Sequence, residues 1–198
     1  MRKFLAGLFS MILLTGCSLA PARSPAPADP YPRVAFITSL GDFVVQLDRQ
    51  RAPLTVANFL HYVGSGFYDG TLIHRVVPGF VIQGGGYTTS YVRKQTRPPI
   101  PNESGNGLAN LRGTIGMARE ADPHSATAQF YINLADNRKL DPHPDRWGYA
   151  VFGTVISGMA VVDRIAAVKT GHAGPFEHDA PLTPVLIVKA VELKPSLD

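Results

Sequence analysis

Cysteine is nearly absent from this sequence, because among its 198 residues only Cys17 carries a thiol. A single cysteine excludes an intramolecular disulfide and any zinc site built on several thiolates. The six histidines do not compensate, since they are scattered and "HPDRWGY" (His143–Tyr149) lacks the spacing of metal ligands. We therefore expect neither a metal ion nor an organic cofactor.

Two common catalytic arrangements are missing as well. No serine, threonine or cysteine is accompanied by a histidine and a carboxylate in a recognisable nucleophile motif. The glycine-rich stretch "GGGYTT" (Gly84–Thr89) is not followed by a helical pattern, so it does not predict a phosphate-binding loop. Neither covalent catalysis nor nucleotide binding is indicated.

The first residues have the organisation of a bacterial export signal. A pair of basic residues precedes "FLAGLFSMILL" (Phe4–Leu14), which is apolar but too short to cross a bilayer, and "LTGC" (Leu14–Cys17) follows at once. This tetrapeptide resembles a lipobox, in which the signal is cut before the cysteine and that cysteine is lipidated. We expect a signal peptide over residues 1–16 and a lipid on Cys17. A plain secretory signal cut near Ser18–Ala20 is the alternative, and it predicts a soluble periplasmic protein.

A proline-rich segment separates the signal from a globular domain. Residues 17–32 contain five prolines among small and polar residues, a composition that cannot bury enough apolar surface to fold. We interpret this segment as a tether that begins at Cys17 and holds the protein on the periplasmic side of a bacterial membrane. Residues 33–198 have the composition and length of one domain.

The charge of the chain gives little indication of a partner. The formal net charge is +4, and the loss of Arg2 and Lys3 with the signal lowers it to +2. The sequence has no basic run and no patch of basic and aromatic residues. We therefore expect no binding to nucleic acid.

Apolar patterns predict a mainly β fold. Two segments repeat apolar residues at helical spacing, Ala52–Gly66 and Gly158–Val168. Many strands with two helices indicate an antiparallel sheet or barrel whose open ends the helices cover. The predicted strands are Arg33–Ser39, Asp42–Asp48, Thr71–Val76, Phe80–Gly84, Gly113–Ala118, Ala128–Leu134, Tyr149–Ile156 and Pro184–Leu193.

Strand alternation groups several of the polar residues. In the sixth predicted strand, Gln129, Tyr131 and Asn133 share one face, which is suited to line a groove, while the other face is apolar. In the fourth, a regular strand places Phe80 and Gln83 on opposite faces. These two residues can serve one site only if the backbone just before the strand is irregular.

Four motifs, in this order, resemble those of the cyclophilin-type peptidyl-prolyl cis-trans isomerases. The similarity runs from about Val34 to Leu193 and points to the bacterial periplasmic branch. It implies a closed eight-stranded antiparallel barrel capped by two helices, in agreement with the strand count. The motifs are "FYDGTLIHRVVPGFVIQGGG" (Phe67–Gly86), "GTIGMAR" (Gly113–Arg119), "SATAQFYINLADN" (Ser125–Asn137) and "YAVFGTVISGMAVVDRI" (Tyr149–Ile165).

The resemblance also implies roles for individual residues. Arg75 corresponds to the catalytic arginine, Phe80 to the floor of the proline pocket, and Gln83 to the carboxamide that orients the arginine and the substrate. The residues implied to bind the substrate are Val81, Met117, Ala118, Arg119 through its main chain, Gln129, Tyr131, Leu140 and Tyr149.

Three positions depart from the pattern of eukaryotic family members. Tyr131 stands where a phenylalanine is usual, Lys139 where a tryptophan or another aromatic residue often lies, and Tyr149 where a histidine is found. In the resembling proteins the aromatic residue at the second position packs against cyclosporin, whereas a lysine has a flexible stem and a strongly hydrated charge. We therefore expect weak cyclosporin binding, unless Trp147, the only tryptophan, takes the place of the missing aromatic residue.

These residues suit a reaction in which no bond is broken. Amide resonance opposes rotation about an X–Pro bond with a barrier of about 18–20 kcal/mol. At the twisted transition state the prolyl nitrogen gains a lone pair, so a fixed guanidinium directed at it binds that state selectively. Arg75 is suited to this role, and Gln83 can hold one arm of its rigid fork.

The sequence therefore predicts a peptidyl-prolyl isomerase that acts on proline-containing peptides and unfolded exported proteins. The alternative is a prolyl-peptide-binding chaperone or adaptor on the same scaffold, in which turnover is incidental. The combination of Arg75, Phe80 and Gln83 favours the enzyme, since a binding module has no need of a transition-state donor. A structural lipoprotein of the envelope explains Cys17 but leaves the motifs unexplained.

Overall fold

The structure is a computed structural model that describes residues 29–194 of the chain. The predicted signal peptide, Cys17 and most of the predicted tether lie outside the described residues. Between residues 29 and 194, no helix is long and apolar enough to cross a membrane.

Eight antiparallel strands close into a barrel. Around it the strands follow the order β1-β10-β3-β4-β6-β5-β7-β2. Each of the eight predicted strand segments overlaps one of them, so the predicted barrel is confirmed. The strands are β1 (Arg33–Thr38), β2 (Gly41–Leu47), β3 (Thr71–Val77), β4 (Val81–Thr88), β5 (Thr114–Met117), β6 (Phe130–Asn133), β7 (Val151–Ser157) and β10 (Val185–Leu193).

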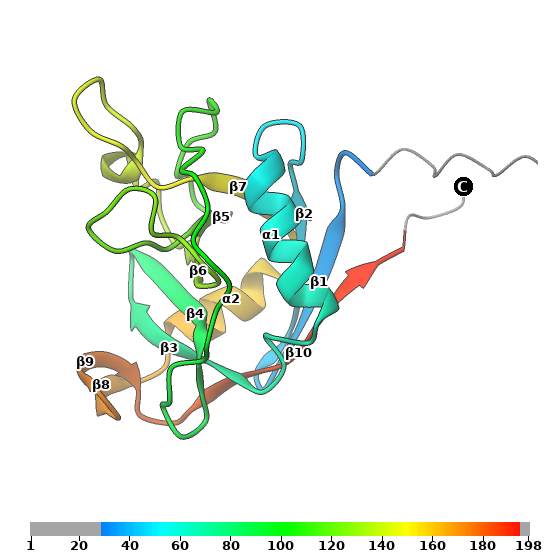
Figure 1. Cartoon of the computed structure of the whole chain (residues 1–198). Coiled ribbons are helices and arrows are strands. Elements are labelled where there is room, and N and C mark those ends of the chain that lie inside the picture. Colours follow the sequence, from blue (N-terminus) through cyan, green and yellow to red (C-terminus); the bar gives the residue numbers. More distant parts are fainter. Residues whose placement is uncertain (1–28, 195–198) are drawn as a thin grey trace, which may run out of the picture.

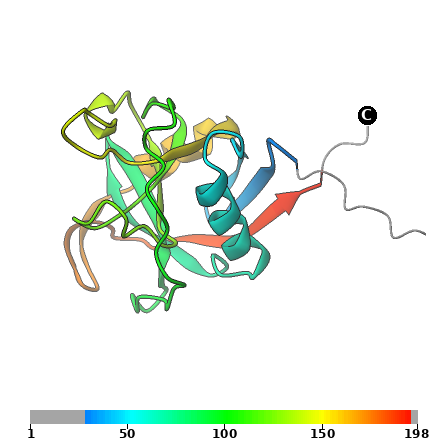
Figure 2. The ribbon, with the colours of Figure 1, turned by 45° about the horizontal axis from the view of Figure 1, so that its top comes forward.

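Two helices cover the barrel, as predicted. Helix α1 (Pro53–Gly64) begins with a proline, which is tolerated in the first turn because that N–H has no helical partner. It buries Phe59, whose ring lies 5.1 Å from that of Phe152 inside the barrel. Helix α2 (Met159–Ala166) buries Val161, Val162 and Ile165. Figures 1 and 2 show α1 on the near side of the barrel and α2 behind it.

A second, two-stranded sheet was not predicted from the sequence. It is a hairpin of β8 (Thr170–Ala173) and β9 (Phe176–Pro181), separate from the barrel and packed beside β3. Its residues show no alternation of apolar and polar side chains, and Phe176 is its only large apolar residue. The hairpin is therefore held by docking onto the barrel rather than by a core of its own (Figure 1).

Candidate active site

The predicted catalytic residues meet where β3 turns into β4. Arg75 in β3 is the direct pairing partner of Gln83 in β4. Phe80 lies in the turn before β4 begins, and Gly79 in this turn has a left-handed φ of 72°, which favours glycine. Because Phe80 precedes the strand, strand alternation does not apply to it, and Phe80 and Gln83 border the same hollow. The irregular backbone expected here is present.

The hollow has a volume of about 210 Å³ and brings together nine of the predicted site residues. Gln129 lines an adjoining hollow of about 100 Å³ that shares Gln83, Ala118 and Arg119 with the first. Met117 lies instead in the barrel core and is 2% exposed. The residues that line the first hollow are Arg75, Phe80, Val81, Gln83, Ala118, Arg119, Tyr131, Leu140 and Tyr149.

A chain of hydrogen bonds links the polar residues of the two hollows. Arg75 donates from Nη1 to Oε1 of Gln83 over 3.4 Å, and Gln83 donates from Nε2 to Oε1 of Gln129 over 3.0 Å. Gly86, the last of the three consecutive glycines, allows Gln129 to take this position. A Cβ on residue 86 would lie 2.6 Å from Cγ of Gln129. The glycine leaves the space that the carboxamide fills.

A carboxylate that sequence reasoning missed also approaches the arginine. Oδ2 of Asp179 in β9 lies 3.7 Å from Nε of Arg75. The two residues are about one hundred positions apart in the sequence, and no motif marks Asp179. Only the docking of the hairpin on β3 brings them together.

The β6 side of the hollow, at Tyr131, joins a buried polar network. The phenol of Tyr131 donates to Oδ1 of Asn110 over 2.6 Å, and the backbone and side-chain amides of Asn110 donate to Oδ1 of Asp141 over 2.7 and 2.9 Å. Burial, followed by the nearby Tyr149, raises the pKa of Tyr131 well above its ordinary value. The phenol therefore stays neutral, and the tyrosine in place of phenylalanine directs its hydroxyl to Asn110.

The same network reaches the floor of the hollow. Asn133 donates to Asn110 over 3.2 Å, and Asn137 donates both to Asn133 over 2.8 Å and to the backbone carbonyl of Phe80 over 2.8 Å. Asn110 and Asn133 are fully buried. Sequence reasoning singled out Asn133 alone among these three asparagines. Asn137 lies in the motif "LADN", but no pattern in the sequence marks an asparagine as buried.

Basic side chains lie around the rim of the hollow. The guanidinium of Arg119 lies 4.4 Å from the ring centroid of Tyr149 and donates to the backbone carbonyl of Trp147 over 3.0 Å. Its side chain therefore fastens the loop around residue 148. Nζ of Lys139 lies 4.7 Å from the ring centroid of Phe80, directly over the predicted floor. Lys139 belongs to the 3₁₀ turn η1 (Arg138–Leu140).

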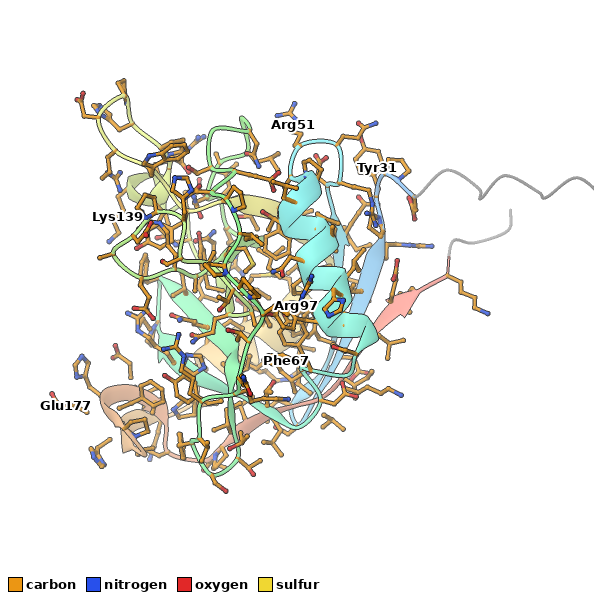
Figure 3. All side chains as sticks on the ribbon, in the orientation of Figure 1. Tyr31, Arg51, Phe67, Arg97, Lys139 and Glu177 are labelled. Carbon is orange, nitrogen blue, oxygen red and sulfur yellow. The ribbon has the colours of Figure 1, made fainter. Side chains whose placement is uncertain are left out.

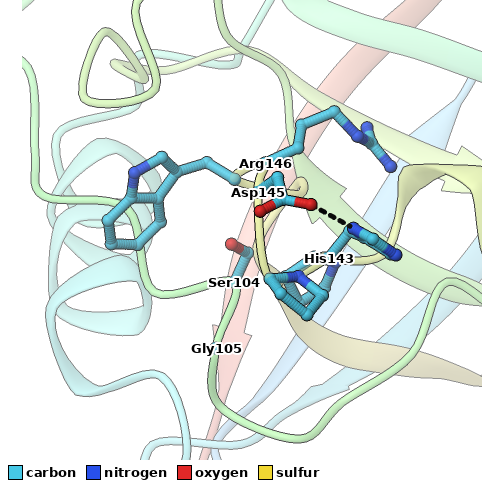
Figure 4. A pocket seen from close by; sticks show the side chains of 8 residues that line it. Ser104, Gly105, His143, Asp145 and Arg146 are labelled. Atoms are coloured by element: carbon cyan, nitrogen blue, oxygen red, sulfur yellow. Dashed lines mark ion pairs between the residues drawn. The ribbon is translucent and has the colours of Figure 1, made fainter.

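Trp147 does not lie over Phe80. Its ring packs edge-on against His124 at 5.1 Å, and it lines a separate hollow of about 420 Å³. Figure 4 shows this separate hollow, in which Nδ1 of His143 lies 3.7 Å from Oδ2 of Asp145. No residue lines both this hollow and the one beside Arg75.

His74, next to Arg75 in the sequence, is buried rather than catalytic. Its ring lies 4.7 Å from that of Tyr87 and 5.2 Å from that of Phe176, and it does not line either hollow of the site. Burial lowers the pKa of His74 to about 4, so its imidazole is neutral at neutral pH. Over the described part of the chain, no group of three histidine, cysteine or acidic residues is arranged to hold a metal ion.

Comparison with known proteins agrees with this fold. Residues 33–192 match the family described as "Cyclophilin type peptidyl-prolyl cis-trans isomerase/CLD". The chain belongs to the cyclophilin-type peptidyl-prolyl cis-trans isomerases. This cyclophilin is 46% identical to peptidyl-prolyl cis-trans isomerase A of Dickeya dadantii, over 98% of both chains. It is 49% identical to peptidyl-prolyl cis-trans isomerase B of Escherichia coli, over 78% of this chain and 95% of that one.

Solved structures support the fold of the enzyme. A cyclophilin from Cryptosporidium parvum aligns with a TM-score of 0.69, at 24% identity, over 83% of this chain and 99% of that one. The same Cryptosporidium protein in the presence of the dipeptide Ala-Pro aligns with a TM-score of 0.68. With its relatives named as isomerases, this cyclophilin is an enzyme that isomerises peptidyl-prolyl bonds.

Proposed function

We propose that Arg75 catalyses the isomerisation, and that the substrates are X–Pro bonds of exported proteins. The observation that carries the first part is the position of the Arg75 guanidinium at the edge of the 210 Å³ hollow, with Nη1 held by Gln83 and the ring of Phe80 at the floor. Because both residues line this hollow, a proline ring bound on Phe80 would place its imide nitrogen on the side of the guanidinium. The flanking peptide is then free to rotate outside.

Catalysis in this scheme is electrostatic and requires no covalent step. As the X–Pro bond twists, the nitrogen loses resonance and becomes a hydrogen-bond acceptor, so Arg75 binds the transition state better than either ground state. The apolar parts of Phe80, Val81 and Leu140 exclude water, which strengthens the directed hydrogen bond. Gln83 and Gln129 supply polar contacts for the peptide backbone.

The proposed test of the site replaces Arg75. In a protease-coupled assay on a series of X–Pro tetrapeptides, Arg75→Ala lowers kcat/KM by the equivalent of about 2–4 kcal/mol in barrier, with thermal stability nearly unchanged. Arg75→Lys restores little, because an ammonium lacks the planar fork. Near-normal turnover by Arg75→Ala would refute the assignment.

The same variant separates the enzyme from the alternative, a prolyl-peptide-binding chaperone or adaptor. A client whose refolding is limited by a prolyl bond refolds faster with the wild-type protein and not with Arg75→Ala. If Arg75→Ala accelerates refolding as well as the wild type, binding rather than turnover assists the client.

The lipobox-like "LTGC" and the proline-rich residues 17–32 support an anchored location on the periplasmic side of a bacterial membrane. The twelve positions from Cys17 to Asp29 span roughly 40 Å if they adopt the extended polyproline conformation. Figure 3 shows Tyr31, near the end of the tether, on the opposite side of the molecule from Lys139, whose ammonium lies over Phe80. A tether attached there leaves the hollow open toward clients.

Intact mass of the mature protein tests the anchor. We expect a chain that begins at Cys17 and carries several acyl chains, since one chain alone binds a membrane only marginally. Cys17→Ser should abolish membrane partitioning while the domain keeps its isomerase activity. A mature chain that begins after Cys17 without lipid would rule the anchor out and leave a soluble periplasmic enzyme.

A further inference from the structure

The β8–β9 hairpin is fixed beside the arginine by an aromatic cluster. The ring of Phe176 stacks on His74 at 5.2 Å with an interplanar angle of 23°, and it meets Tyr87 edge-on at 5.0 Å and 78°. His74 directly precedes Arg75 in β3. The hairpin therefore docks one residue away from Arg75. In Figure 3 Glu177, next to Phe176, lies at the outer edge of the hairpin, away from the barrel.

The backbone of Asp179 is unusual for a strand residue. Its φ is 65°, in the left-handed region that only glycine, asparagine and aspartate adopt readily. Such a residue interrupts the alternation of β9, in which Asp179 stands three positions after Phe176. The only other left-handed residue besides glycine within residues 29–194 is Tyr91, whose ring lies 6.2 Å from Phe176. Both of these left-handed residues therefore lie in the hairpin or beside it.

The carboxylate of Asp179 contacts the arginine on a different nitrogen from Gln83. Oδ2 of Asp179 lies 3.7 Å from Nε, whereas Oε1 of Gln83 accepts from Nη1 over 3.4 Å. A single contact of 3.4 Å leaves the planar guanidinium free to rotate about its flexible stem. The carboxylate of Asp179 attracts the guanidinium at a second nitrogen and so restricts this rotation.

We propose that Asp179 is the positioning residue of Arg75, presented by the β8–β9 hairpin. It acts through the guanidinium and does not touch the substrate, so this inference rests on the proposed catalytic role of Arg75. The carboxylate also reduces the positive potential at the site, but this effect is the smaller one. The Arg75 and Asp179 side chains are 37% and 30% exposed, so water and salt screen the charge, whereas orientation acts directly on the distance to the prolyl nitrogen.

The test is a double-mutant cycle between the two residues, measured with an uncharged X–Pro tetrapeptide. Asp179→Asn removes the charge and tolerates the left-handed backbone, and Asp179→Gly tolerates it without any side chain. We expect both variants to lower kcat by about fivefold to tenfold and to change KM by less than about twofold, because orientation matters at the transition state. Both keep the melting temperature of the wild type within a few degrees.

The Arg75→Ala background decides whether the two residues act together. There, Asp179→Asn should change kcat/KM by less than about twofold, since the group that it positions is gone. Glu177→Gln is the matched control, because it removes an exposed carboxylate from the same strand, and it should leave kcat at the wild-type value.

Four results would overturn the inference. If both Asp179 variants keep the wild-type kcat while Arg75→Ala loses turnover, Asp179 has no positioning role and the role of Arg75 stands. If the losses add in the double variant, or if KM rises with kcat unchanged, Asp179 acts independently of Arg75. If Arg75→Ala itself retains normal turnover, the proposed function fails, and the inference about Asp179 fails with it.

Discussion

The two sides of the hollow are held in different ways. On the β5–β6 side, Tyr131 and Asn133 donate to the buried Asn110 over 2.6 and 3.2 Å, and Asn110 donates in turn to Asp141. On the β3–β4 side, Arg75 is 37% exposed, and its contacts span 3.4 and 3.7 Å. One side is a buried network with short bonds, and the other is a half-exposed cation with long contacts.

This difference separates the stability of the site from its chemistry. Breaking a buried hydrogen-bond network costs the full desolvation penalty of each group left unpaired, whereas exposed ion pairs contribute about 0–1 kcal/mol. The Asn110 side therefore sets the shape of the hollow and contributes to folding stability. The Arg75 side contributes little to stability, and the energy of its contacts becomes important only when a twisted prolyl bond is present.

Replacing Asn110 gives the largest expected effect on stability. Asn110→Ala leaves the buried Tyr131 hydroxyl without its acceptor and removes one of the two acceptors of the Asn133 amide. It also removes the side-chain donor to Asp141, whereas the backbone N–H of residue 110 remains as a donor. We expect the free energy of unfolding to fall by about 3 kcal/mol in urea denaturation. Arg75→Ala is the comparison, because it should change stability by less than about 1 kcal/mol. Equal losses in the two variants would mean that the two sides are not held differently.

Asn110→Asp sharpens the same test. The new carboxylate keeps the shape of the side chain but lies beside Asp141, so the like charges and the lost amide donors both destabilise the folded state. This variant should be at least as unstable as Asn110→Ala at neutral pH and should recover part of its stability as the pH falls. A variant as stable as the wild type would show that the network is not a fixed structural unit.

Acid pH should lower the free energy of unfolding through His74, which lies next to Arg75 in β3. Burial lowers the pKa of His74 to about 4 in the folded state, below the value of about 6.5 in an unfolded chain. The unfolded state therefore binds the proton first, and the stability contributed by neutral His74 is present above pH 6.5 and is lost as the pH falls toward 4. Between pH 7 and pH 5 we expect a loss of about 2 kcal/mol in the free energy of unfolding.

The measurement compares urea denaturation at pH 7 and pH 5 for the wild type and for His74→Phe, which keeps a ring between Tyr87 and Phe176. The pH-dependent loss should be about 2 kcal/mol smaller in His74→Phe. His172→Gln, a replacement of an exposed histidine in the β8–β9 hairpin, serves as the control and should show the wild-type loss. An identical pH dependence in His74→Phe would exclude His74 as its source.

The sequence was sufficient to predict the barrel and to select residues that line one hollow, but not to predict the contacts that hold them. Local alternation defines a strand such as β6, and the ordered motifs bring Arg75, Phe80 and Gln83 to one hollow. Asp179 was missed because its contact depends on docking of the β8–β9 hairpin, which is fixed by one aromatic residue rather than by a pattern. Asn110 was missed because burial of an asparagine follows from the whole fold and not from its neighbours in the chain.

The smallest expected effect concerns the rim, where Lys139 contacts the Arg75 side through Phe80. Its ammonium lies 4.7 Å from the Phe80 ring centroid, and Trp147 packs against His124 instead of replacing the missing aromatic residue. The unmodified enzyme should therefore isomerise short peptides normally and bind cyclosporin weakly. Lys139→Trp should tighten cyclosporin inhibition by about tenfold or more, equivalent to about 1.4 kcal/mol, and change turnover little, because a short prolyl peptide depends on Arg75, Phe80 and Gln83.

Titration of both proteins with cyclosporin in the peptide assay measures this effect. Trp147→Phe is the matched control, since Trp147 lines a different hollow and its replacement should leave inhibition unchanged. Tight inhibition of the unmodified enzyme would show that a lysine over Phe80 does not weaken drug binding. If Lys139→Trp instead lowered kcat as strongly as an Asp179 variant, Lys139 would have to be counted with the residues that hold the site, and the rim would not be independent of the Arg75 side.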